Sequence, residues 1–317
     1  MKTNIRHRLS ILLALLCLVS VILVISVPDG GSCQQEPEIR VETVMDAVSR
    51  IPSVDSIVYE KVSYPYKDIT LTETEFYCRG LINHMFVFQV DLGSGLTFRP
   101  CSPDNQPVSG ARQTVLEQAV SAESAGVNVL YGINADVFGG YRDDLPGQAV
   151  PMGVLYIDEK PYQDFHHASA ENVFYVLRNG KVKIEKYEKF QQERKKVKHA
   201  VGAWHTLVWN GHKASVPDDI LGLGYHPRTF IGMTEDSRIV YVFVLDGRQP
   251  GWSEGLQMQD MMDICLATGC YRAVNFDGGG STTLVARNPE GFVVMNRPSD
   301  EGNLPRPVVD GLLIIKE

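Results

Sequence analysis

Three consecutive glycines follow an apolar strand near the C-terminus, in the sequence NFDGGGSTTLV at residues 275–285. The segment before them, RAVNF, reads as a β-strand, so Asp277 lies at its carboxyl end. Glycine has no side chain, so it lets the backbone turn sharply and lets another group approach closely. The stretch is therefore either a tight turn or a place where a ligand contacts the backbone.

The residues around the glycines favour a ligand site over a simple turn. Successive glycine N–H groups can converge on an anion, and no side chain blocks the approach of a phosphate. We therefore expect the N–H groups of residues 278–281 to form an anion-binding concavity. The candidate residues of this stretch are Asn275, Asp277, Gly278, Gly279, Gly280, Ser281 and Thr282.

A second strand ends in Asp-Gly further upstream. In VFVLDGRQPGWSEGL, Asp246 and Arg248 follow an apolar run together, and Glu254 precedes the next helix. Arginine suits phosphate because its planar guanidinium can make two parallel hydrogen bonds. Taken alone, this segment is better explained by a hairpin turn with a surface ion pair.

Two more strands lead into polar residues and glycine. The sequence GYHPRTFIGM carries Arg228 and Thr229, and YGINADVFGG carries Asn134 and Asp136. Each of these segments, taken alone, is also compatible with an ordinary loop. Their interest lies in the combination with the glycine stretch.

The N-terminal segment predicts export. Basic residues in MKTNIRHRLS precede an uncharged apolar run at residues 9–27. This run fits a cleaved signal or an uncleaved anchor, and GGSC, which ends at Cys33, resembles a bacterial lipoprotein processing site. We expect residues 1–33 to attach the protein to the membrane of the cell envelope, in the periplasm or at the cell surface.

The composition of the whole chain limits its partners. The net charge is −8, which argues against nucleic acid as a partner, because a phosphate backbone favours a basic face. With 317 residues and 44% hydrophobic content, the chain can build one large core or two small ones. We divide it into the leader, a linker with a small helix-strand region at residues 34–79, and a main domain at residues 80–317.

Strand patterns outnumber helix patterns along the chain. The apolar periodicity predicts strands at 84–92 and 238–247, a hairpin at 172–187 around an Asn-Gly turn, and helices at 36–51, 111–126 and 255–270. The charged segment EKFQQERKKVKHA, residues 188–200, reads as a solvated loop. Strands and helices do not alternate regularly, so we expect an α+β fold with a mixed, largely antiparallel sheet core and a few flanking helices.

Cysteine and histidine add little chemistry. After export, Cys78, Cys101, Cys265 and Cys270 would meet oxidising conditions, and we expect Cys265 and Cys270 to pair because they are close, with isolated buried thiols as the alternative. No HExxH or similar spacing predicts a transition-metal site. We therefore expect no cofactor, although Asp136, Asp246 and Asp277 could form an oxygen-lined Ca²⁺ or Mg²⁺ site. His205, beside a tryptophan, could form a pocket wall.

In combination, these segments resemble the phosphodiester glycosidase family. The resemblance runs in order through INADVF, PMGVLYIDEKP, PRTFIGMTEDSRIVYVFVLDGR, SEGLQMQDMMDICLATGCYRAVNFDGGGSTTLV and NRPSDEGNLPRPV, and covers roughly residues 80–315. The part from residue 227 to residue 285 is the most specific. The chain departs from the family pattern at residues 134–138 and at Glu301, which bears on the substrate more than on the fold.

The resemblance implies hydrolysis between the anomeric carbon of a sugar and a phosphodiester oxygen. Phosphate is a good leaving group, so one carboxylate can suffice where ordinary glycosidases need two. Asp277 is the candidate nucleophile or base, with Asp246 and Glu254 as alternates. Arg228, Arg248 and the glycine N–H groups would hold the phosphate. The hydrogen-bonding candidates for the sugar or phosphate are Asn134, Asp136, Thr229, Asn275, Ser281, Thr282 and Asn296.

The sequence thus predicts an exported, membrane-attached hydrolase that acts on a sugar-1-phosphodiester, in a cell-surface, dietary or host glycan. The alternative is a non-catalytic envelope lipoprotein that binds glycan or phosphate. Asp246, Arg248, Asp277 and the triple glycine favour the enzyme, and the altered NADVF segment favours a changed substrate.

Overall fold

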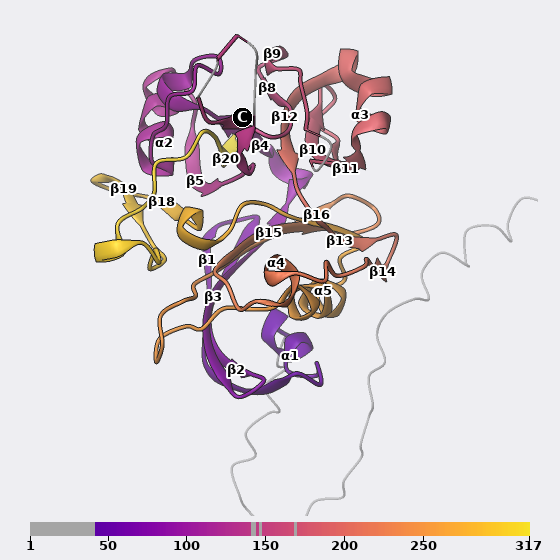
Figure 1. Cartoon of the computed structure of the whole chain (residues 1–317), viewed down its shortest axis with the longest axis vertical. Coiled ribbons are helices and arrows are strands. Elements are labelled where there is room, and N and C mark those ends of the chain that lie inside the picture. The colour runs from indigo at the N-terminus through magenta and orange to yellow at the C-terminus, as the bar shows by residue number, and fades with distance from the viewer. Residues whose placement is uncertain (1–41, 141–143, 146–147, 168–169) are drawn as a thin grey trace, which may run out of the picture. The chain divides into compact units, whose positions relative to one another are not determined.

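The computed structural model describes residues 42–140, 144–145, 148–167 and 170–317. Residues 42–317 form one compact unit (Figure 1). The predicted leader at residues 1–33 lies outside the described residues. Within the described part, no helix has the length and apolar character needed to cross a membrane.

The described residues form antiparallel sheets. The largest sheet has eight strands, in the order β1 (Val54–Tyr66), β2 (Ile69–Cys78), β3 (Leu81–Asp91), β16 (Ile239–Leu245), β15 (Arg228–Met233), β17 (Arg272–Asn275), β13 (Thr206–Trp209) and β14 (His212–Lys213). A second sheet has the order β11 (Val182–Lys186), β10 (Asn172–Leu177), β12 (Val197–Ala203), β8 (Leu155–Ile157) and β9 (Lys160–Gln163). A third has the order β19 (Gly291–Val294), β18 (Leu284–Asn288), β5 (Val129–Asn134), β20 (Gly311–Lys316) and β4 (Leu96–Cys101). A short ladder joins β6 (Phe138–Gly140) to β7 (Val150–Pro151).

Few helices accompany these sheets. The α-helices are α1 (Val44–Val48), α2 (Val115–Ser124), α3 (Tyr187–Glu193), α4 (Ile220–Leu223) and α5 (Met258–Ala267). Single 3₁₀ turns occur at η1 (Leu92–Ser94), η2 (Pro103–Asn105), η3 (Arg194–Lys196), η4 (Gly279–Ser281) and η5 (Glu301–Asn303). Capping boxes start α1 at Thr43 and α2 at Thr114. The predicted α+β class with largely antiparallel sheets is confirmed, as are the three helices and the hairpin of β10 and β11.

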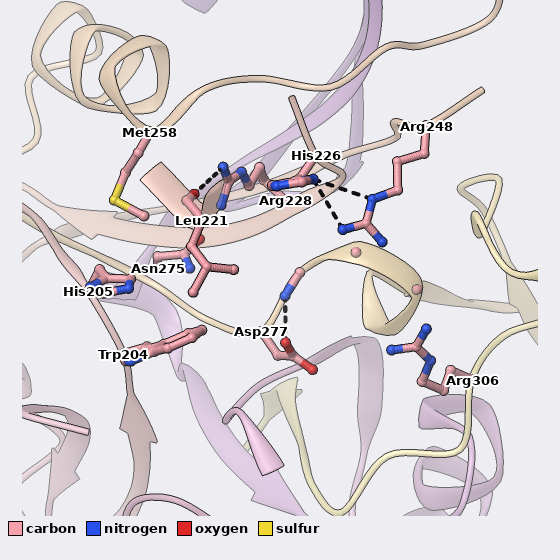
Figure 2. Close-up of a pocket in the computed structure, with 13 residues that line it drawn as sticks. Trp204, His205, Leu221, His226, Arg228, Arg248, Met258, Asn275, Asp277 and Arg306 are labelled. Carbon is pink, nitrogen blue, oxygen red and sulfur yellow. Dashed lines mark hydrogen bonds between the residues drawn. The ribbon is translucent and has the colours of Figure 1, made fainter. Parts of the chain in front are cut away.

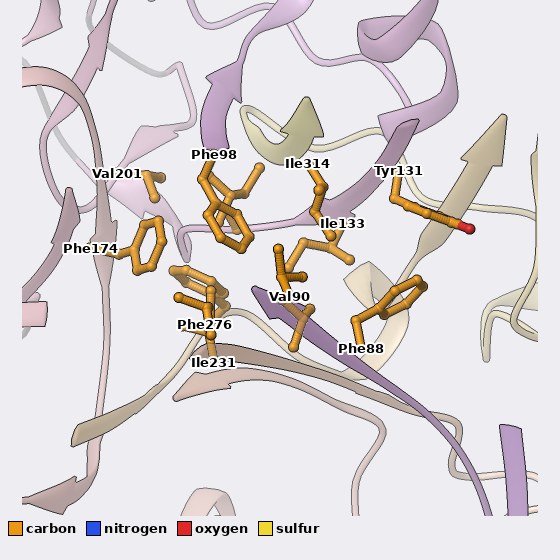
Figure 3. Packing of buried hydrophobic residues seen from close by; sticks show 14 of the residues in the cluster. Phe88, Val90, Phe98, Tyr131, Ile133, Phe174, Val201, Ile231, Phe276 and Ile314 are labelled. Carbon is orange, nitrogen blue, oxygen red and sulfur yellow. The ribbon is translucent and has the colours of Figure 1, made fainter. Parts of the chain in front are cut away.

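The main hydrophobic core lies where the three sheets meet. One face of the eight-stranded sheet contributes Phe88 and Ile231, and the second and third sheets contribute Phe174 and Phe98 (Figure 3). The rings of Phe98 and Phe174 pack edge to face at 5.2 Å between centroids. This core holds the carboxyl end of β17 in place, because Phe276, the residue after that strand's last, is fully buried in it.

The opposite face of the eight-stranded sheet is covered by helices. Methionines of α1 and α5 pack there against Phe230 and Phe243, whose rings stack at 4.4 Å between centroids. The spacing of buried residues in α5, at Met258, Met261, Met262 and Cys265, is that of a helix with one apolar face. The sheet is therefore buried on both faces at its inner strands β15, β16 and β17.

The predicted loop at residues 188–200 is wrong. These residues form most of α3, then η3 and the first half of β12. The high charge density hid two apolar positions, Phe190 and Val197, which are buried in a cluster on the second sheet. Glu193, the last residue of α3, accepts hydrogen bonds from Lys183 on β11 and Tyr175 on β10, so the end of the helix is tied to the second sheet.

The predicted Cys265–Cys270 disulfide is also wrong. Both residues, like Cys78 and Cys101, are buried free thiols. The two cysteines lie together because the Cys270 N–H donates to the Cys265 carbonyl, at 2.8 Å, as α5 ends. Burial, reinforced by the neighbouring Cys270 thiol, raises the pKa of the Cys265 thiol well above its ordinary value. Cys265 therefore stays protonated and packs as a small apolar side chain.

The register of β15, β16 and β17 brings three chain segments together at one end of these strands. Arg228, at the start of β15, pairs with Leu245 at the end of β16, and Phe230 pairs with Asn275 at the end of β17. The chain segments that follow β16 and β17 therefore leave the sheet beside the residue that opens β15. The candidate site lies at this end of the three strands.

Candidate active site

A cavity of about 220 Å³ lies at this end of β15, β16 and β17 (Figure 2). Segments far apart in the sequence supply its lining, from the strand ends, α4, α5 and the C-terminal loop. The lining residues are Trp204, His205, Leu221, His226, Arg228, Arg248, Met258, Asn275, Asp277, Gly278, Gly279, Gly280 and Arg306. The cavity thus contains Asp277, all three glycines, both predicted arginines and the predicted wall residue His205.

Asp277 is the one carboxylate in this lining. Its backbone is fixed, because its N–H donates to the Ala135 carbonyl at 2.8 Å and its carbonyl accepts from the Asn134 amide at 2.7 Å. Burial raises the pKa of its carboxyl, and the Ser281 hydroxyl, the Gly278 N–H, Arg306 and Arg248 act in the opposite direction. Asp277 is therefore a rigidly placed carboxylate with an increased proton affinity.

The glycines allow close packing around Asp277. A Cβ on Gly278 would lie 2.7 Å from the Pro227 carbonyl oxygen, and one on Gly280 would lie 2.0 Å from the Arg306 guanidinium. Gly279 also needs glycine for its conformation, because its φ of +60° lies in the left-handed region. The stretch is thus both a tight turn and a pocket wall.

The expected concavity of converging N–H groups is largely absent. The Gly278 N–H donates to the Asp277 carboxylate, the Gly279 N–H to the Pro227 carbonyl and the Ser281 N–H to the Gly278 carbonyl. Among the described residues, only the Gly280 N–H of this group has no hydrogen-bond acceptor. The backbone therefore offers one donor to a ligand, and the arginines supply most of the positive charge.

Arg228 and Arg248 are two neighbouring cations in the cavity lining. Arg228 is buried and donates to the carbonyls of Leu256, Leu221 and Gly224, at 3.1, 2.8 and 3.2 Å. Burial, and then the charge of Arg248, lower its pKa to about 10. Neither guanidinium makes an ion pair with a carboxylate in the described part of the chain, so both retain their charge for a ligand.

Arg306 is a third cation that sequence reasoning did not single out. It lies on the opposite side of the glycine turn from Arg228 (Figure 2). Two hydrogen bonds of 2.8 Å hold its guanidinium against Asp300, and its Nη1 lies 3.4 Å from the Ser281 hydroxyl. The only sequence signal was its place in the segment NRPSDEGNLPRPV, where the resemblance gave it no separate role.

The other half of the cavity is aromatic and apolar. Trp204 and His205 stack at 4.6 Å between centroids, and Leu221 and Met258 complete this wall. Two polar atoms here, His205 Nε2 and Asn275 Oδ1, are buried and have no hydrogen-bond partner within the described residues. Burial lowers the pKa of His205, so its ring is neutral at neutral pH. This wall can hold an apolar face while offering two polar contacts.

Asp246 and Glu254 lie outside the cavity lining. Asp246 is buried, and its carboxylate accepts hydrogen bonds from Trp252 Nε1, the Asn296 amide and the Arg297 N–H, at 3.1, 3.0 and 3.0 Å. These bonds fix the loop that carries Arg248. Glu254 contributes through its backbone, because its carbonyl accepts from the Arg248 N–H at 3.1 Å.

Most of the predicted polar side chains also lie behind the cavity. Asn134 accepts from the Thr229 hydroxyl at 2.7 Å and from the Thr283 N–H at 3.1 Å, so it orients the Asp277 turn. Asn296 bridges Asp246 and the backbone around Thr282. The side chains of Thr229, Ser281 and Thr282 are buried and absent from the lining. Only Asn275 of this set reaches the cavity.

Asp136 belongs to a separate buried acid pair. Its N–H donates to Asp310 Oδ1 at 2.9 Å, and its own Oδ2 accepts from the Gly153 N–H at 2.5 Å. Burial raises the pKa of Asp136 to about 7 and that of Asp310 well above its ordinary value. Over the described ranges, no three histidine, cysteine or acidic side chains gather closely enough to hold a metal ion.

The family model described as phosphodiester glycosidase matches residues 128–315. No sequence among curated proteins matches the chain. A hypothetical protein from Synechocystis superposes with a TM-score of 0.57 at 12% identity, over 82% of this chain and 64% of its own, so the chain spans less than two thirds of it.

Two further solved structures share the fold. The zebrafish N-acetylglucosamine-1-phosphodiester alpha-N-acetylglucosaminidase catalytic domain, auto-inhibited by its pro-peptide, gives a TM-score of 0.57 at 16% identity, with 85% of each chain covered. A protein from Burkholderia pseudomallei, named a candidate exported protein, gives 0.55 at 14% identity, with 74% of each chain covered. At these identities the likeness concerns the fold.

Proposed function

Because this chain belongs to the phosphodiester glycosidase family, we propose that it hydrolyses the bond between the anomeric carbon of a sugar and a phosphodiester oxygen. The observation that carries the proposal is the shared cavity of Asp277, Arg228 and Arg248, in which one carboxylate faces cations that have no carboxylate partner in the described residues. An anionic group and a reacting carbon can be bound there side by side.

The phosphate would occupy the cationic half of the cavity. Arg228, Arg248 and Arg306 surround it from different segments, and the Gly280 N–H supplies a backbone donor. Negative charge grows on the bridging oxygen as the bond to the sugar breaks. Donors that are already fixed in place stabilise such charge more than water does, because they need not reorganise as the bond breaks. The arginines would therefore serve both binding and departure of the phosphate.

Asp277 would act as the general base. It takes a proton from water while the water oxygen attacks the anomeric carbon, and the carbon–oxygen bond breaks with its electron pair passing to the phosphate monoester. Burial raises the pKa of Asp277, which suits a group that must accept a proton. With one carboxylate in the lining, a single displacement with inversion at the anomeric carbon is the mechanism we propose.

The sugar would lie against the aromatic wall. Trp204 offers a flat apolar face, and the unpartnered His205 Nε2 and Asn275 Oδ1 offer polar contacts for substituents of the ring. The zebrafish relative is named for an N-acetylglucosamine phosphodiester. A 2-acetamido sugar therefore belongs among the first substrates to test on this chain.

Export and attachment to the cell envelope are part of the proposal. They rest on the basic N-terminal residues and the apolar run at residues 9–27. An enzyme so placed would meet sugar phosphodiesters of cell-surface, dietary or host glycans.

The test is a substrate screen with matched carboxylate variants. The full chain would be incubated with methyl phosphodiesters of α- and β-linked sugars, with and without a 2-acetamido group, and with UDP-sugars. We expect sugar release that Asp277→Asn abolishes and Glu254→Gln leaves near the wild-type rate, because only Asp277 lines the cavity. Binding of these compounds without any release would instead support the non-catalytic binding protein.

A further inference from the structure

Arg248 is an exposed arginine whose single side-chain hydrogen-bond partner among the described residues is His226. Its backbone adopts φ of +57°, and its guanidinium donates to His226 Nδ1 from Nε at 3.3 Å and from Nη2 at 3.1 Å. Fixing a long exposed side chain costs conformational entropy, which a contact must offset. The direction of the Arg248 guanidinium therefore depends on its hydrogen bonds to His226. We propose that His226 is a positioning residue, which holds the Arg248 guanidinium toward the anion as a neutral hydrogen-bond acceptor.

The contacts of His226 define its tautomer. Its Nε2 lies 2.8 Å from the Ile220 carbonyl oxygen, which can only accept, so the proton resides on Nε2. Nδ1 therefore carries a lone pair and accepts from Arg248. Figure 2 shows the His226 ring between the Arg228 and Arg248 side chains.

A neutral acceptor serves an anion site better than a carboxylate. Asp300 orients Arg306 but also compensates its charge. His226 orients Arg248 and leaves that charge available to the ligand. The carbonyl oxygens around Arg228 act in the same way, because they accept hydrogen bonds without neutralising the guanidinium.

The backbone of His226 is tightly enclosed. It forms an antiparallel bridge with Leu256. A Cβ on Gly255 would lie 2.5 Å from the His226 carbonyl oxygen, and one on Gly247 would lie 2.9 Å from its carbonyl carbon. Glycine at these two positions lets the loops close around the histidine. The ring is therefore placed by the fold before any ligand binds.

This arrangement makes anion binding depend on pH. Burial lowers the pKa of His226, the Ile220 carbonyl raises it, and the charges of Arg228 and Arg248 lower it further. Across the cavity it faces Asp277 and Arg306. At low pH the protonated ring can no longer accept, so Arg248 loses its partner. Protonation of His226 and of Asp277 also makes the lining more positive, so anion affinity should change below the ordinary histidine range as the net of a lost acceptor and an added charge.

The inference rests on the proposed assignment of this cavity as the phosphate site, and its test does not need turnover. The probe is inorganic sulfate, which stays a dianion across the pH range and is measured by calorimetry on the full chain. We expect His226→Leu to weaken sulfate binding about tenfold, the size of one charge-assisted hydrogen bond. The same change in an Arg248→Gln background should add nothing, because the effect passes through Arg248.

Two variants separate positioning from folding. His226→Asn places an amide oxygen near the position of Nδ1 and should retain affinity at neutral pH while losing the part of the pH dependence that comes from His226. His212→Leu, an exposed histidine on β14, should bind like wild type. No sulfate binding to wild type, equal effects of His226→Leu with and without Arg248, or an unchanged pH profile in His226→Asn would each overturn the inference. Failure to hydrolyse any phosphodiester would refute only the proposed function.

Discussion

Replacement of Gly279 by alanine separates a strained turn from a ligand site. Gly279 has φ of +60°, and an added Cβ would lie 2.8 Å from Arg248 Nη1. The methyl group thus has two effects, one on the backbone and one on Arg248, the cation that we propose binds the anion. The first acts on stability, and the second acts on binding.

The two effects have different sizes. A residue with a side chain costs about 1–2 kcal/mol in the left-handed region, so unfolding should be easier by that amount. The clash with Nη1 involves the end of a flexible side chain, so the protein can relieve it by moving Arg248 away. A lost hydrogen bond to a charged group costs about 1.5–3 kcal/mol, which corresponds to a loss of affinity of about 10- to 150-fold.

The assay pairs Gly279→Ala with Gly269→Ala. Gly269 has φ of +83° and no atom within 4 Å of its added Cβ, so it carries the backbone cost alone. Chemical denaturation would give the stability of both variants, and calorimetry would give their affinity for sulfate. We expect similar stability losses and an affinity loss in Gly279→Ala only. Equal affinities in the two variants would refute the placement of Arg248 at an anion site.

Three further predictions use other parts of the chain. Arg248→Lys should lower kcat/KM about tenfold with little change in the thermal midpoint, because a point charge cannot replace a two-pronged guanidinium; an unchanged kcat/KM would place Arg248 outside the site. The pKa of Asp136 is raised to about 7 by burial, so the folded state holds the extra proton and stability should fall as pH rises from about 4 to 7. Asp136→Asn should flatten that slope in denaturation curves, and an unaltered slope would contradict the assignment. The full chain should fractionate with membranes while a chain from residue 34 does not, and Cys33→Ser should remove palmitate labelling only if the leader is that of a lipoprotein.

The strands were predictable because their patterns are local. The alternation that predicted the β10–β11 hairpin needs only an Asn-Gly turn and neighbouring apolar residues. The loop prediction for residues 188–200 was wrong because a helix that buries one side chain, Phe190, among many charged residues has almost no apolar periodicity. Its stability comes from the cluster it covers on the second sheet, which no local window contains.

The site residues could be predicted where residues adjacent in the sequence line the cavity together. Asp277 and the glycines follow one strand, so a single motif located them. Asp246 and Arg248 also lie two residues apart, yet only Arg248 reaches the cavity. Both residues follow the end of β16, and Arg248 has a positive φ, so strand alternation does not put their side chains on one side. Asp246 contacts Trp252 and Asn296 instead. Arg306 enters from a loop after η5, and only the folded chain brings it to Ser281.

The charge pattern explains why this cavity differs from the rest of the surface. The chain has a net charge of −8, and many of its arginines pair with carboxylates, as Arg238 does with Asp91. Arg228 and Arg248 lie together without such a partner among the described residues, at a cost that the lowered pKa of Arg228 records. An acidic chain has ample carboxylates to compensate two cations. Asp277 is the one carboxylate among the described lining residues and offsets one of these charges, so the cavity keeps a positive charge that the phosphodiester we propose as substrate would balance.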